Sequence, residues 1–379
     1  MRKKIFLFSR DPGGANTVIP LVKPLKEKGY IVRLFGKDAA LEKYLKADLS
    51  GFNIANFVKN IDIEYIKKFL INEQPDFIIT DTSLDFIERY LWKAAEDLKI
   101  PSFAILDQWV NYGIRFSKYN PSETNEYNKD KTYPYLPSKI LVMDDFAKQE
   151  AIKEGLPPDR ITVAGQPHFE TLLKKKLSLQ KSRNLREELC INQSDFLITF
   201  ASEPVSKDYQ QSGDSGHYWG FTEKTIFKEL FNGINEISFK YNKNISIIIK
   251  LHPREDIDNY SNMVSPLKRN KITLNVIKKT NPTDLILSSD LICGMSSIFL
   301  IESIVLGKPT ISIQIGLNKE NPFILDRRDI LKSIVDQKTL IKQLESIIIK
   351  NNYPSYKFDF IKNPVNNILL QMEKFRCQG

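Results

Sequence analysis

Cysteine and histidine are scarce in this sequence, with three of each among 379 residues. Cys190, Cys293 and Cys377 are far apart, so no pair has the spacing of metal ligands, and an odd number does not build a disulfide framework. We therefore expect a reducing compartment. No convincing Asp-x-Asp pair follows an expected strand either, so the sequence predicts no metal and no other cofactor.

Long apolar runs are also missing. The run Ile5–Phe8 is too short for a signal peptide, and no small-residue cleavage site follows it. No segment approaches the roughly 20 apolar residues of a membrane span. These features predict a cytoplasmic protein.

The net charge of +9 and the pI near 9.1 leave two interpretations. Acidic residues are interspersed throughout, which is typical of an ordinary solvated surface. The excess of basic residues would also attract anionic substrates, or allow peripheral contact with the anionic inner face of a membrane. No nucleic-acid-binding motif is present, so nucleic acid is not an expected partner.

The chain has too many residues for one compact core and enough for two domains. Short apolar runs alternate with longer amphipathic ones, as in parallel sheets with helices on both faces. The alternation restarts at Asp195, after a connector at residues 169–189. We predict two doubly wound Rossmann-like domains facing a cleft, residues 1–175 and 176–379, and leave open whether the last helix packs on the first domain. Strands are expected over residues 4–9, 30–36, 76–82, 100–107, 137–145, 161–165, 195–202, 245–253, 272–278 and 308–316, and a helix running into a strand is expected over residues 282–294.

The stretch RDPGGAN follows the first expected strand and precedes a helix expected over residues 15–29. Ligands of open α/β sheets bind at the carboxyl ends of strands. Gly13 and Gly14 predict positive φ angles or the close approach of a ligand, and their spacing is not the dinucleotide fingerprint G-x-G-x-x-G. Asp11 is interpreted either as a helix cap or as a general base. In the second interpretation the acceptor side of the site contains Arg10, Gly13, Gly14 and Asn16.

The expected strand over residues 100–107 ends in a mixture of polar and aromatic groups. Asp107 is the second candidate for the catalytic base. The other side chains suit sugar binding by stacking and hydrogen bonding, although a buried tryptophan in a packed loop fits equally well. These acceptor-binding candidates are Trp109, Asn111, Tyr112 and Arg115.

In the second half, IIIKLHPRED and GMSSIFLIES carry the clearest motifs. The first ends a strand in basic and hydrogen-bonding groups, which suits an anion. The second offers hydroxyl and N–H groups at a helix start, which suits a phosphate, although an ordinary helix cap at Ser296 fits equally well. A polar loop at residues 200–224 is expected to bring Glu203 or Ser202 near the same ligand. The donor-binding candidates are Glu203, Lys250, His252, Pro253, Arg254, Gly294, Ser296, Ser297 and Glu302.

The order His252-Pro253 and then Ser296-Ser297 resembles bacterial GT-B glycosyltransferases. That group contains sialyl- and polysialyltransferases, Kdo transferases of capsule assembly and CDP-glycerol glycerophosphotransferases. The resemblance implies a GT-B fold in which both motifs hold a cytidine nucleotide. Residues 296–311 are also similar to the nucleotide-binding helix of UDP-GlcNAc 2-epimerases, in which a glutamate grips the ribose, and Glu302 stands at that position.

From these features we predict a glycosyltransferase of capsule or lipopolysaccharide biosynthesis. It would move a sugar or polyol phosphate from a CMP- or CDP-linked donor to a cell-surface glycan or lipid-linked acceptor, without a metal ion. One alternative is an isomerase or hydrolase of the UDP-GlcNAc 2-epimerase type, which needs no acceptor and would use several carboxylates around the sugar. The other is a catalytically silent nucleotide-binding protein.

Overall fold

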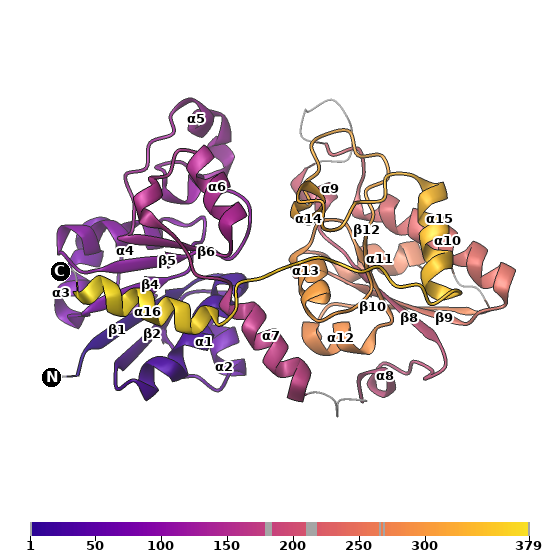
Figure 1. The fold of residues 1–379 in the computed structure, drawn as a ribbon, viewed down its shortest axis with the longest axis horizontal. Coiled ribbons are helices and arrows are strands. Elements are labelled where there is room, and N and C mark those ends of the chain that lie inside the picture. The colour runs from indigo at the N-terminus through magenta and orange to yellow at the C-terminus, as the bar shows by residue number, and fades with distance from the viewer. Residues whose placement is uncertain (1, 179–183, 210–217, 265–266, 268–269, 378–379) are drawn as a thin grey trace. The chain divides into compact units, whose positions relative to one another are not determined.

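The computed structural model describes residues 2–178, 184–209, 218–264, 267 and 270–377 (Figure 1). The chain divides into two compact units, which are Met1–Thr171 with Asp359–Gly379, and Leu172–Phe358. Helix α7 (Pro167–Ser178) contains both this division and the boundary expected between residues 175 and 176. Each unit is a Rossmann-like α/β unit built on one parallel sheet, which confirms the predicted fold class.

The sheet of unit 1 has the strand order β3-β2-β1-β4-β5-β6-β7, and all of its pairings are parallel. β3 has only two residues and was not expected, because so short a strand leaves no pattern in the sequence. The strands are β1 (Lys4–Ser9), β2 (Ile31–Gly36), β3 (Phe52–Asn53), β4 (Phe77–Thr80), β5 (Ser102–Ile105), β6 (Lys139–Val142) and β7 (Ile161–Val163). Besides α7, the helices are α1 (Pro12–Glu27), α2 (Ala39–Lys46), α3 (Ile63–Glu73), α4 (Phe86–Asp97), α5 (Thr124–Lys129), α6 (Asp145–Lys153) and α16 (Pro364–Cys377), with 3-10 turns η1 (Ile54–Asn56), η2 (Ile114–Phe116), η3 (Pro121–Glu123) and η4 (Pro158–Arg160).

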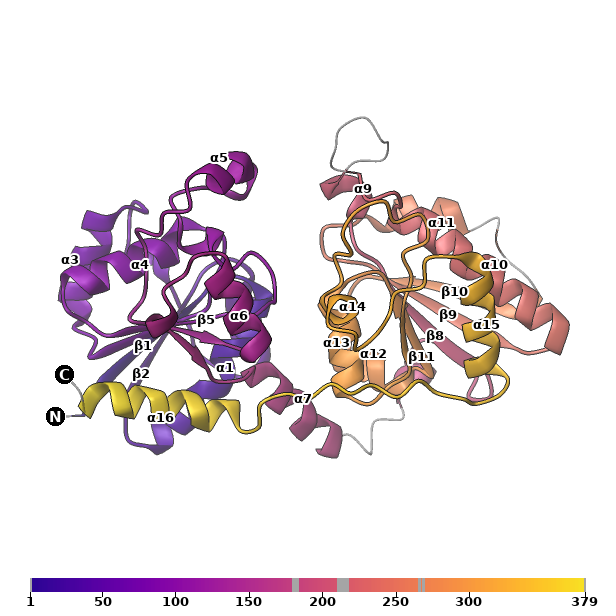
Figure 2. The ribbon, with the colours of Figure 1, turned by 45° about the horizontal axis from the view of Figure 1, so that its top comes forward.

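Helices cover both faces of this sheet, so β1 is apolar without alternation. Successive side chains of a strand point to opposite faces. Accordingly, Ile5 and Leu7 pack in one core with residues of α1 and α16, whereas Phe6 and Phe8 pack in another with residues of α3 and α4. Figure 2 shows α16 on the opposite side of the sheet from α3 and α4.

The sheet of unit 2 has the order β10-β9-β8-β11-β12 and is also entirely parallel. Its central strands are buried; Ile245–Ile249 of β9 lies wholly in the core. The strands are β8 (Phe196–Ala201), β9 (Ile245–Lys250), β10 (Ile272–Ile277), β11 (Leu291–Gly294) and β12 (Thr310–Ser312). The helices are α8 (Asn184–Glu188), α9 (Val205–Asp208), α10 (Glu223–Tyr241), α11 (Ile257–Val264), α12 (Pro282–Ser288), α13 (Ile298–Val305), α14 (Ile324–Arg327) and α15 (Gln337–Ile348).

No helix among the described residues is both long enough and apolar enough to span a membrane.

Candidate active site

The turn between β1 and α1 differs from the expected left-handed turn. Helix α1 begins at Pro12, so Gly13 and Gly14 lie in its first turn, and neither has a positive φ. Proline is favoured at this position because its fixed φ suits a helix. Asp11 precedes the helix as its N-cap residue, but its side chain makes no capping hydrogen bond. The carboxylate is half exposed and lies 3.5 Å from Nη1 of Arg10.

Two carboxyl groups explain why both residues are glycine. A Cβ added to Gly13 would lie 2.5 Å from Oδ2 of Asp107, and a Cβ added to Gly14 would lie 1.4 Å from Oδ2 of Asp81. Both distances are far shorter than a van der Waals contact. The close approach that the sequence predicted for a ligand is therefore made by the chain's own carboxyl groups. They reach the N-terminal end of α1, where free N–H groups favour negative charge.

Four carboxyl groups gather at this edge of the sheet. β1, β4 and β5 are neighbours, so their carboxyl ends bring together Asp11, Asp81 and Asp107, and the first turn of α4 adds Glu88. The exposed fraction falls from 48% for the Asp11 side chain to 11% for Asp107, and then to 1% for Asp81 and 0% for Glu88. The cluster therefore reaches from solvent into the core. The sequence analysis missed Asp81 and Glu88, although Asp81 directly follows a strand and could have been found by the rule that found Asp107.

Asp107 is paired with a buried guanidinium. Nη1 of Arg115 lies 3.3 Å from Oδ1 of Asp107 and also donates to the carbonyl oxygen and the hydroxyl of Thr82. Burial raises the pKa of Asp107, and the positive charge of Arg115 opposes part of that rise. Arg115, expected to bind an acceptor, thus holds the carboxyl group of the second base candidate in place.

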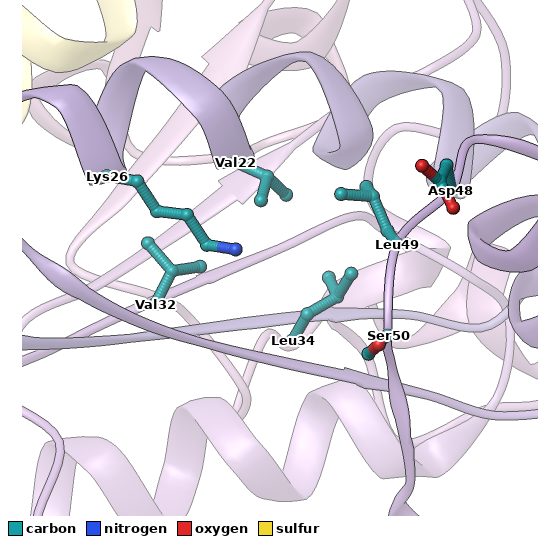
Figure 3. Close-up of a pocket in the computed structure, with 7 residues that line it drawn as sticks. All are labelled: Val22, Lys26, Val32, Leu34, Asp48, Leu49 and Ser50. Atoms are coloured by element: carbon teal, nitrogen blue, oxygen red, sulfur yellow. The ribbon is translucent and has the colours of Figure 1, made fainter.

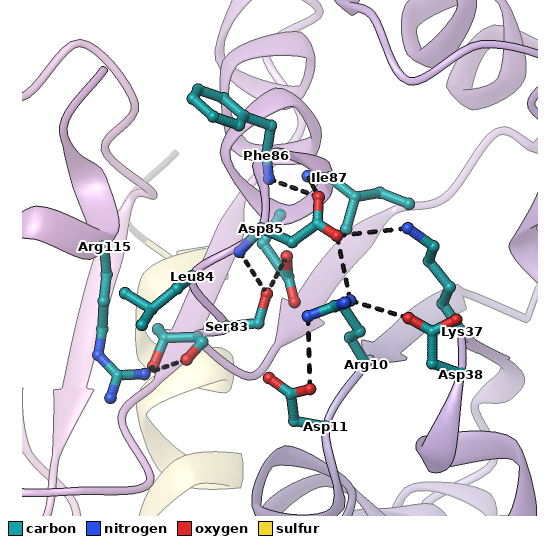
Figure 4. Close-up of polar contacts among 12 residues, drawn as sticks. Arg10, Asp11, Lys37, Asp38, Ser83, Leu84, Asp85, Phe86, Ile87 and Arg115 are labelled. Atoms are coloured by element: carbon teal, nitrogen blue, oxygen red, sulfur yellow. Dashed lines mark hydrogen bonds and ion pairs between the residues drawn. The ribbon is translucent and has the colours of Figure 1, made fainter. Parts of the chain in front are cut away.

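Arg10 lies among three carboxylates, as Figure 4 shows. Its Nε is 3.0 Å from Oδ2 of both Asp38 and Asp85, and its Nη1 faces Asp11. Burial alone would lower the pKa of Arg10, but Asp11, Asp85 and Asp38 together raise it. Arg10 is therefore a fixed positive charge beside the most exposed carboxylate of the cluster.

The other expected acceptor residues lie around this cluster in different surroundings. Trp109 is buried, donates from Nε1 to Oδ2 of Asp144 at 3.0 Å and stacks on Phe169, and Tyr112 is also buried. Their rings are packed inside the unit, so they offer no face for stacking on a sugar. Asn111 has a φ of 58° and accepts a hydrogen bond from Arg115 through its carbonyl. Asn16 accepts one from Lys43.

In unit 2, the neighbouring strands β9, β8 and β11 are followed, two residues beyond their ends, by His252, Glu203 and Ser296. Oε1 of Glu203 accepts the backbone N–H of Ser296 at 2.7 Å, and Oε2 accepts its hydroxyl at 2.9 Å. Burial raises the pKa of Glu203, and these hydrogen bonds oppose the rise. Ser297 is the N-cap of α13 and accepts the N–H of Phe299. Ser297, and not Ser296, is therefore the helix cap, and the hydroxyl of Ser296 is a donor to Glu203.

His252 is held in one tautomer. Its Nδ1 accepts the backbone N–H of Arg254 at 3.2 Å, so the neutral ring carries its proton on Nε2. Burial lowers the pKa of His252 to about 4, and the charges of Arg254 and Lys250 add to this effect. The ring is therefore a neutral hydrogen-bond donor near pH 7. The guanidinium of Arg254 is neutralised by Asp208, with N–O distances of 2.8 and 2.6 Å.

Glu255 is a further buried residue that the sequence analysis missed. Its carboxylate accepts hydrogen bonds from the Ser202 hydroxyl at 2.7 Å, the Tyr260 hydroxyl at 2.9 Å and the backbone N–H of His252 at 2.7 Å. It thus ties the end of β8 to the turn after β9. Its only signal in the sequence is its place two residues after His-Pro.

The remaining donor-site candidates lie on the same edge. The Nζ atom of Lys250 lies 5.5 Å from the ring centroid of Phe299. Pro253 is exposed, and Glu302 is buried in α13. A Cβ on Gly294 would lie 3.1 Å from the carbonyl oxygen of Ala201, so this glycine allows β11 to approach β8 closely. Residues 210–217 of the expected loop lie outside the described residues.

Figure 3 shows a pocket of about 160 Å³ in unit 1. It lies between the second half of α1, strand β2 and the segment after α2. None of the residues predicted for the site lines it. The lining residues are Val22, Lys26, Val32, Leu34, Asp48, Leu49 and Ser50.

Comparison with known proteins gives a consistent picture. No family model matches the chain. The UDP-N-acetylglucosamine 2-epimerase of Methanocaldococcus jannaschii is 25% identical over 194 residues, which are 50% of this chain and 45% of that enzyme. The matched stretch is thus less than half of that enzyme's length.

Solved structures match over nearly the whole chain. The M. jannaschii UDP-GlcNAc 2-epimerase has a TM-score of 0.68 at 17% identity and covers 99% of this chain and 100% of its own. The fold is that of the UDP-GlcNAc 2-epimerases. A putative UDP-N-acetylglucosamine 2-epimerase of Listeria monocytogenes has a TM-score of 0.70 at 14% identity, covering 100% and 98%. The Neisseria meningitidis UDP-GlcNAc 2-epimerase bound to UDP-GlcNAc has a TM-score of 0.62 at 16% identity, and the match covers 98% of this chain and 100% of that enzyme.

These findings confirm the GT-B fold, which UDP-GlcNAc 2-epimerases share with glycosyltransferases. They correct the predicted function. The relative and the structural neighbours are 2-epimerases, so the prediction of a glycosyltransferase with a CMP- or CDP-linked donor is wrong. The resemblance to sialyl-, Kdo and CDP-glycerol transferases extends to the shared fold only. A His-Pro dipeptide and a serine pair at strand ends are too short to separate the two groups.

Proposed function

We propose that this chain is a nucleotide-sugar isomerase that inverts carbon 2 of a UDP-N-acetylhexosamine. The observation that carries the proposal is the cluster of Asp11, Asp81, Glu88 and Asp107 at one edge of the sheet of unit 1. The 2-epimerase from M. jannaschii and the N. meningitidis 2-epimerase bound to UDP-GlcNAc support the assignment of the substrate.

Inversion at carbon 2 needs both a base and an acid. The C2–H bond must break, and a proton must return to the opposite face of the sugar. No carbonyl neighbours C2, so its proton can leave only as the C1–O bond to UDP breaks and a C1=C2 double bond forms. Return of UDP and of a proton from the other side completes the reaction. We assign the two proton transfers to Asp11 and Asp107, the two carboxyl groups of the cluster that are not fully buried.

The nucleotide end is assigned to unit 2. Negative charge develops on the diphosphate as the C1–O bond breaks, and fixed hydrogen-bond donors stabilise such charge. The Nε2–H group of His252 and the start of α13 at Ser296 are the proposed donors, with Lys250 supplying positive charge. By the resemblance to the 2-epimerases, Glu302 is assigned to bind the ribose of the nucleotide. The expected donor-binding residues thus remain predictions, now for a uridine nucleotide.

The test is incubation with UDP-GlcNAc in D₂O without any acceptor, followed by ¹H NMR. We expect the C2 epimer to appear and deuterium to enter at C2 of both sugars. Asp107→Asn should lower the rate by about 10²–10⁴-fold, because it can no longer transfer a proton. Asp62→Asn, which changes a capping carboxylate at the start of α3, is the matched control and should retain the activity.

Two results would overturn this proposal. Retention of the C2 proton after prolonged incubation with a folded protein excludes the isomerase. Binding of UDP-GlcNAc without any exchange would instead favour the silent nucleotide-binding protein.

A further inference from the structure

The carbonyl oxygen of Met295 is held by two side chains from the neighbouring strand. The backbone pairing of β11 with β12 ends where the N–H of Ile313 donates to the carbonyl oxygen of Gly294 at 2.8 Å. One residue further along, the hydroxyl of Ser312 donates to the Met295 carbonyl at 2.6 Å, and Nε2 of Gln314 donates to it at 3.1 Å. Side chains therefore continue the hydrogen bonding past the last backbone pair.

Gln314 is a polar residue in a fully buried position. Its side chain is 0% exposed, and its Oε1 has no hydrogen-bond partner among the described residues. A buried acceptor without a partner costs free energy, which an apolar side chain of the same shape would avoid. The amide nitrogen must face the Met295 carbonyl, because a carbonyl can only accept. Donation to Met295 is therefore what distinguishes glutamine from an apolar residue at this position.

The hydroxyl of Ser312 also has one defined direction. A serine hydroxyl has a single proton, and that of Ser312 is donated to Met295. Ser312 must therefore accept a hydrogen bond from the hydroxyl of Ser333, whose oxygen lies 2.9 Å away. Hydrogen bonds in a chain polarise one another, so the donation from Ser333 makes Ser312 a stronger donor to Met295.

The peptide bond between Met295 and Ser296 transmits this orientation. A trans peptide unit is planar, and its C=O and N–H groups point in opposite directions. Two donors fix the direction of the Met295 carbonyl and, with it, that of the N–H group of Ser296. This N–H group and the Ser296 hydroxyl donate to the carboxylate of Glu203, at 2.7 and 2.9 Å. The oriented peptide thus already holds an anionic group.

We infer that Ser312 and Gln314 are positioning residues that aim the N–H group of Ser296 at the diphosphate of the substrate. The inference rests on the proposed function for the identity of that anion. Both side chains are 0% exposed, so neither touches the ligand, and each acts through the peptide between Met295 and Ser296. An N–H group held in place before the C1–O bond breaks stabilises the charge that develops on the diphosphate without any reorganisation.

The first test needs neither ligand nor activity. Burial raises the pKa of Glu203, and the hydrogen bonds from Ser296 oppose that rise. The double variant Ser312→Ala with Gln314→Met removes both donors to the carbonyl, so Glu203 should titrate at higher pH than in the wild type. The measurement is ¹³C NMR of the full-length protein, labelled at the side-chain carboxyl carbon of glutamate, and Glu203→Gln identifies the signal by removing it. Gln314→Met alone should give a smaller shift in the same direction.

Ser303→Ala is the matched control. Ser303 is also 0% exposed, but its hydroxyl donates to the carbonyl oxygen of Leu300 within α13, at 2.7 Å. Its removal should leave the titration of Glu203 unchanged, and so should Ser312→Thr, which keeps the hydroxyl. A folded double variant, or a folded Gln314→Met protein, in which Glu203 titrates as in the wild type would overturn the inference. An equal shift in Ser303→Ala would also overturn it, because the effect would then be one of general packing.

The second test is calorimetric titration with UDP, with Glu203→Gln present in every protein so that its charge does not compete. Adding Ser312→Ala and Gln314→Met should weaken UDP binding by about tenfold, the lower end of what a hydrogen bond to a charged group contributes. Adding Ser303→Ala should leave the affinity unchanged. Equal affinities with and without the two donors would contradict the inference. Absence of UDP binding in the wild type and in Glu203→Gln would instead contradict the proposed function, and the titration of Glu203 would stand.

Discussion

The carboxylate of Glu203 accepts both the backbone N–H and the hydroxyl of Ser296, at 2.7 and 2.9 Å. These are the groups at the start of α13 that the sequence analysis assigned to a phosphate. A carboxylate and a phosphate cannot use the same two donors at once. In this structure the chain's own side chain occupies the expected anion position.

This contact predicts that Glu203 competes with a nucleotide. Glu203→Gln removes the negative charge, so we expect UDP to bind more tightly by about 1.5 kcal/mol, which is the lower end of what a hydrogen bond to a charged group contributes. Isothermal titration calorimetry measures the change. Asp336→Asn is the matched control, because Asp336 accepts the N–H and the hydroxyl of Thr339 at the start of α15 in the same way. Weaker binding by Glu203→Gln would show that Glu203 positions Ser296 for the ligand instead.

The neutral state of His252 predicts a second result. Because burial lowers its pKa to about 4, the Nε2–H group stays a donor from pH 5.5 to 8, and its contribution to UDP binding should not change over that range. His252→Ala should weaken binding by roughly 1.5–3 kcal/mol at every pH in the range, as expected for a hydrogen bond to a charged group. Arg254→Ala is the comparison variant and should weaken UDP binding less, because Asp208 already neutralises that guanidinium. Calorimetry that shows a loss for His252→Ala only at low pH would contradict a neutral donor.

Gly14 predicts an unusual effect of alanine in a helix. Replacing glycine by alanine inside a helix normally stabilises a protein by roughly 0.5–1 kcal/mol. Here the new Cβ would lie 1.4 Å from Oδ2 of Asp81, so we expect Gly14→Ala to destabilise the fold by about 1–3 kcal/mol, the usual cost of overpacking. Urea unfolding measures the loss. Asp81→Gly in the same chain should recover part of it, and strictly additive effects of the two changes would argue against the contact.

The buried carboxyl groups predict how stability depends on pH. Burial is the main cause that raises the pKa values of Asp81, Glu88 and Asp107 in the folded protein, so the folded state binds more protons than the unfolded state above about pH 4. The contribution of these three groups to the free energy of unfolding then falls as the pH rises, and for Glu88 the fall extends through about pH 7. Glu88→Gln should flatten this part of the curve, measured by denaturant unfolding between pH 5.5 and 8.5. Parallel curves for the variant and the wild type would show that Glu88 does not titrate in this range.

The sequence predicted the fold more fully than the site. Apolar strands such as β9 and the restart of the alternation at Asp195 specify two parallel sheets, because periodicity depends on local residues only. The strand-end rule also found Asp11, Asp107, His252 and Ser296. It could not show that Gly14 makes room for Asp81, because that contact joins residues far apart in the chain.

The function predicted from the sequence was wrong for a related reason. The His-Pro and Ser-Ser motifs describe where the chain can hold an anion, and this requirement is common to transferases and isomerases of one fold. What separates the two is the chemistry at the sugar. The carboxyl cluster that supports the proposed isomerisation includes Glu88, which the sequence shows only as one more acidic residue on a helix.

The chain path through α16 has a consequence for biosynthesis. Unit 1 is assembled from residues 1–171 and 359–379, whereas unit 2 is one continuous segment. Ile368 and Met372 of α16 belong to the same core as α1. A ribosome therefore releases every residue of unit 2 before it releases the helix that covers this face of unit 1. Unit 1 begins first but is completed only after unit 2 has been synthesised, and until α16 emerges the apolar surface of unit 1 along α1 is open to aggregation.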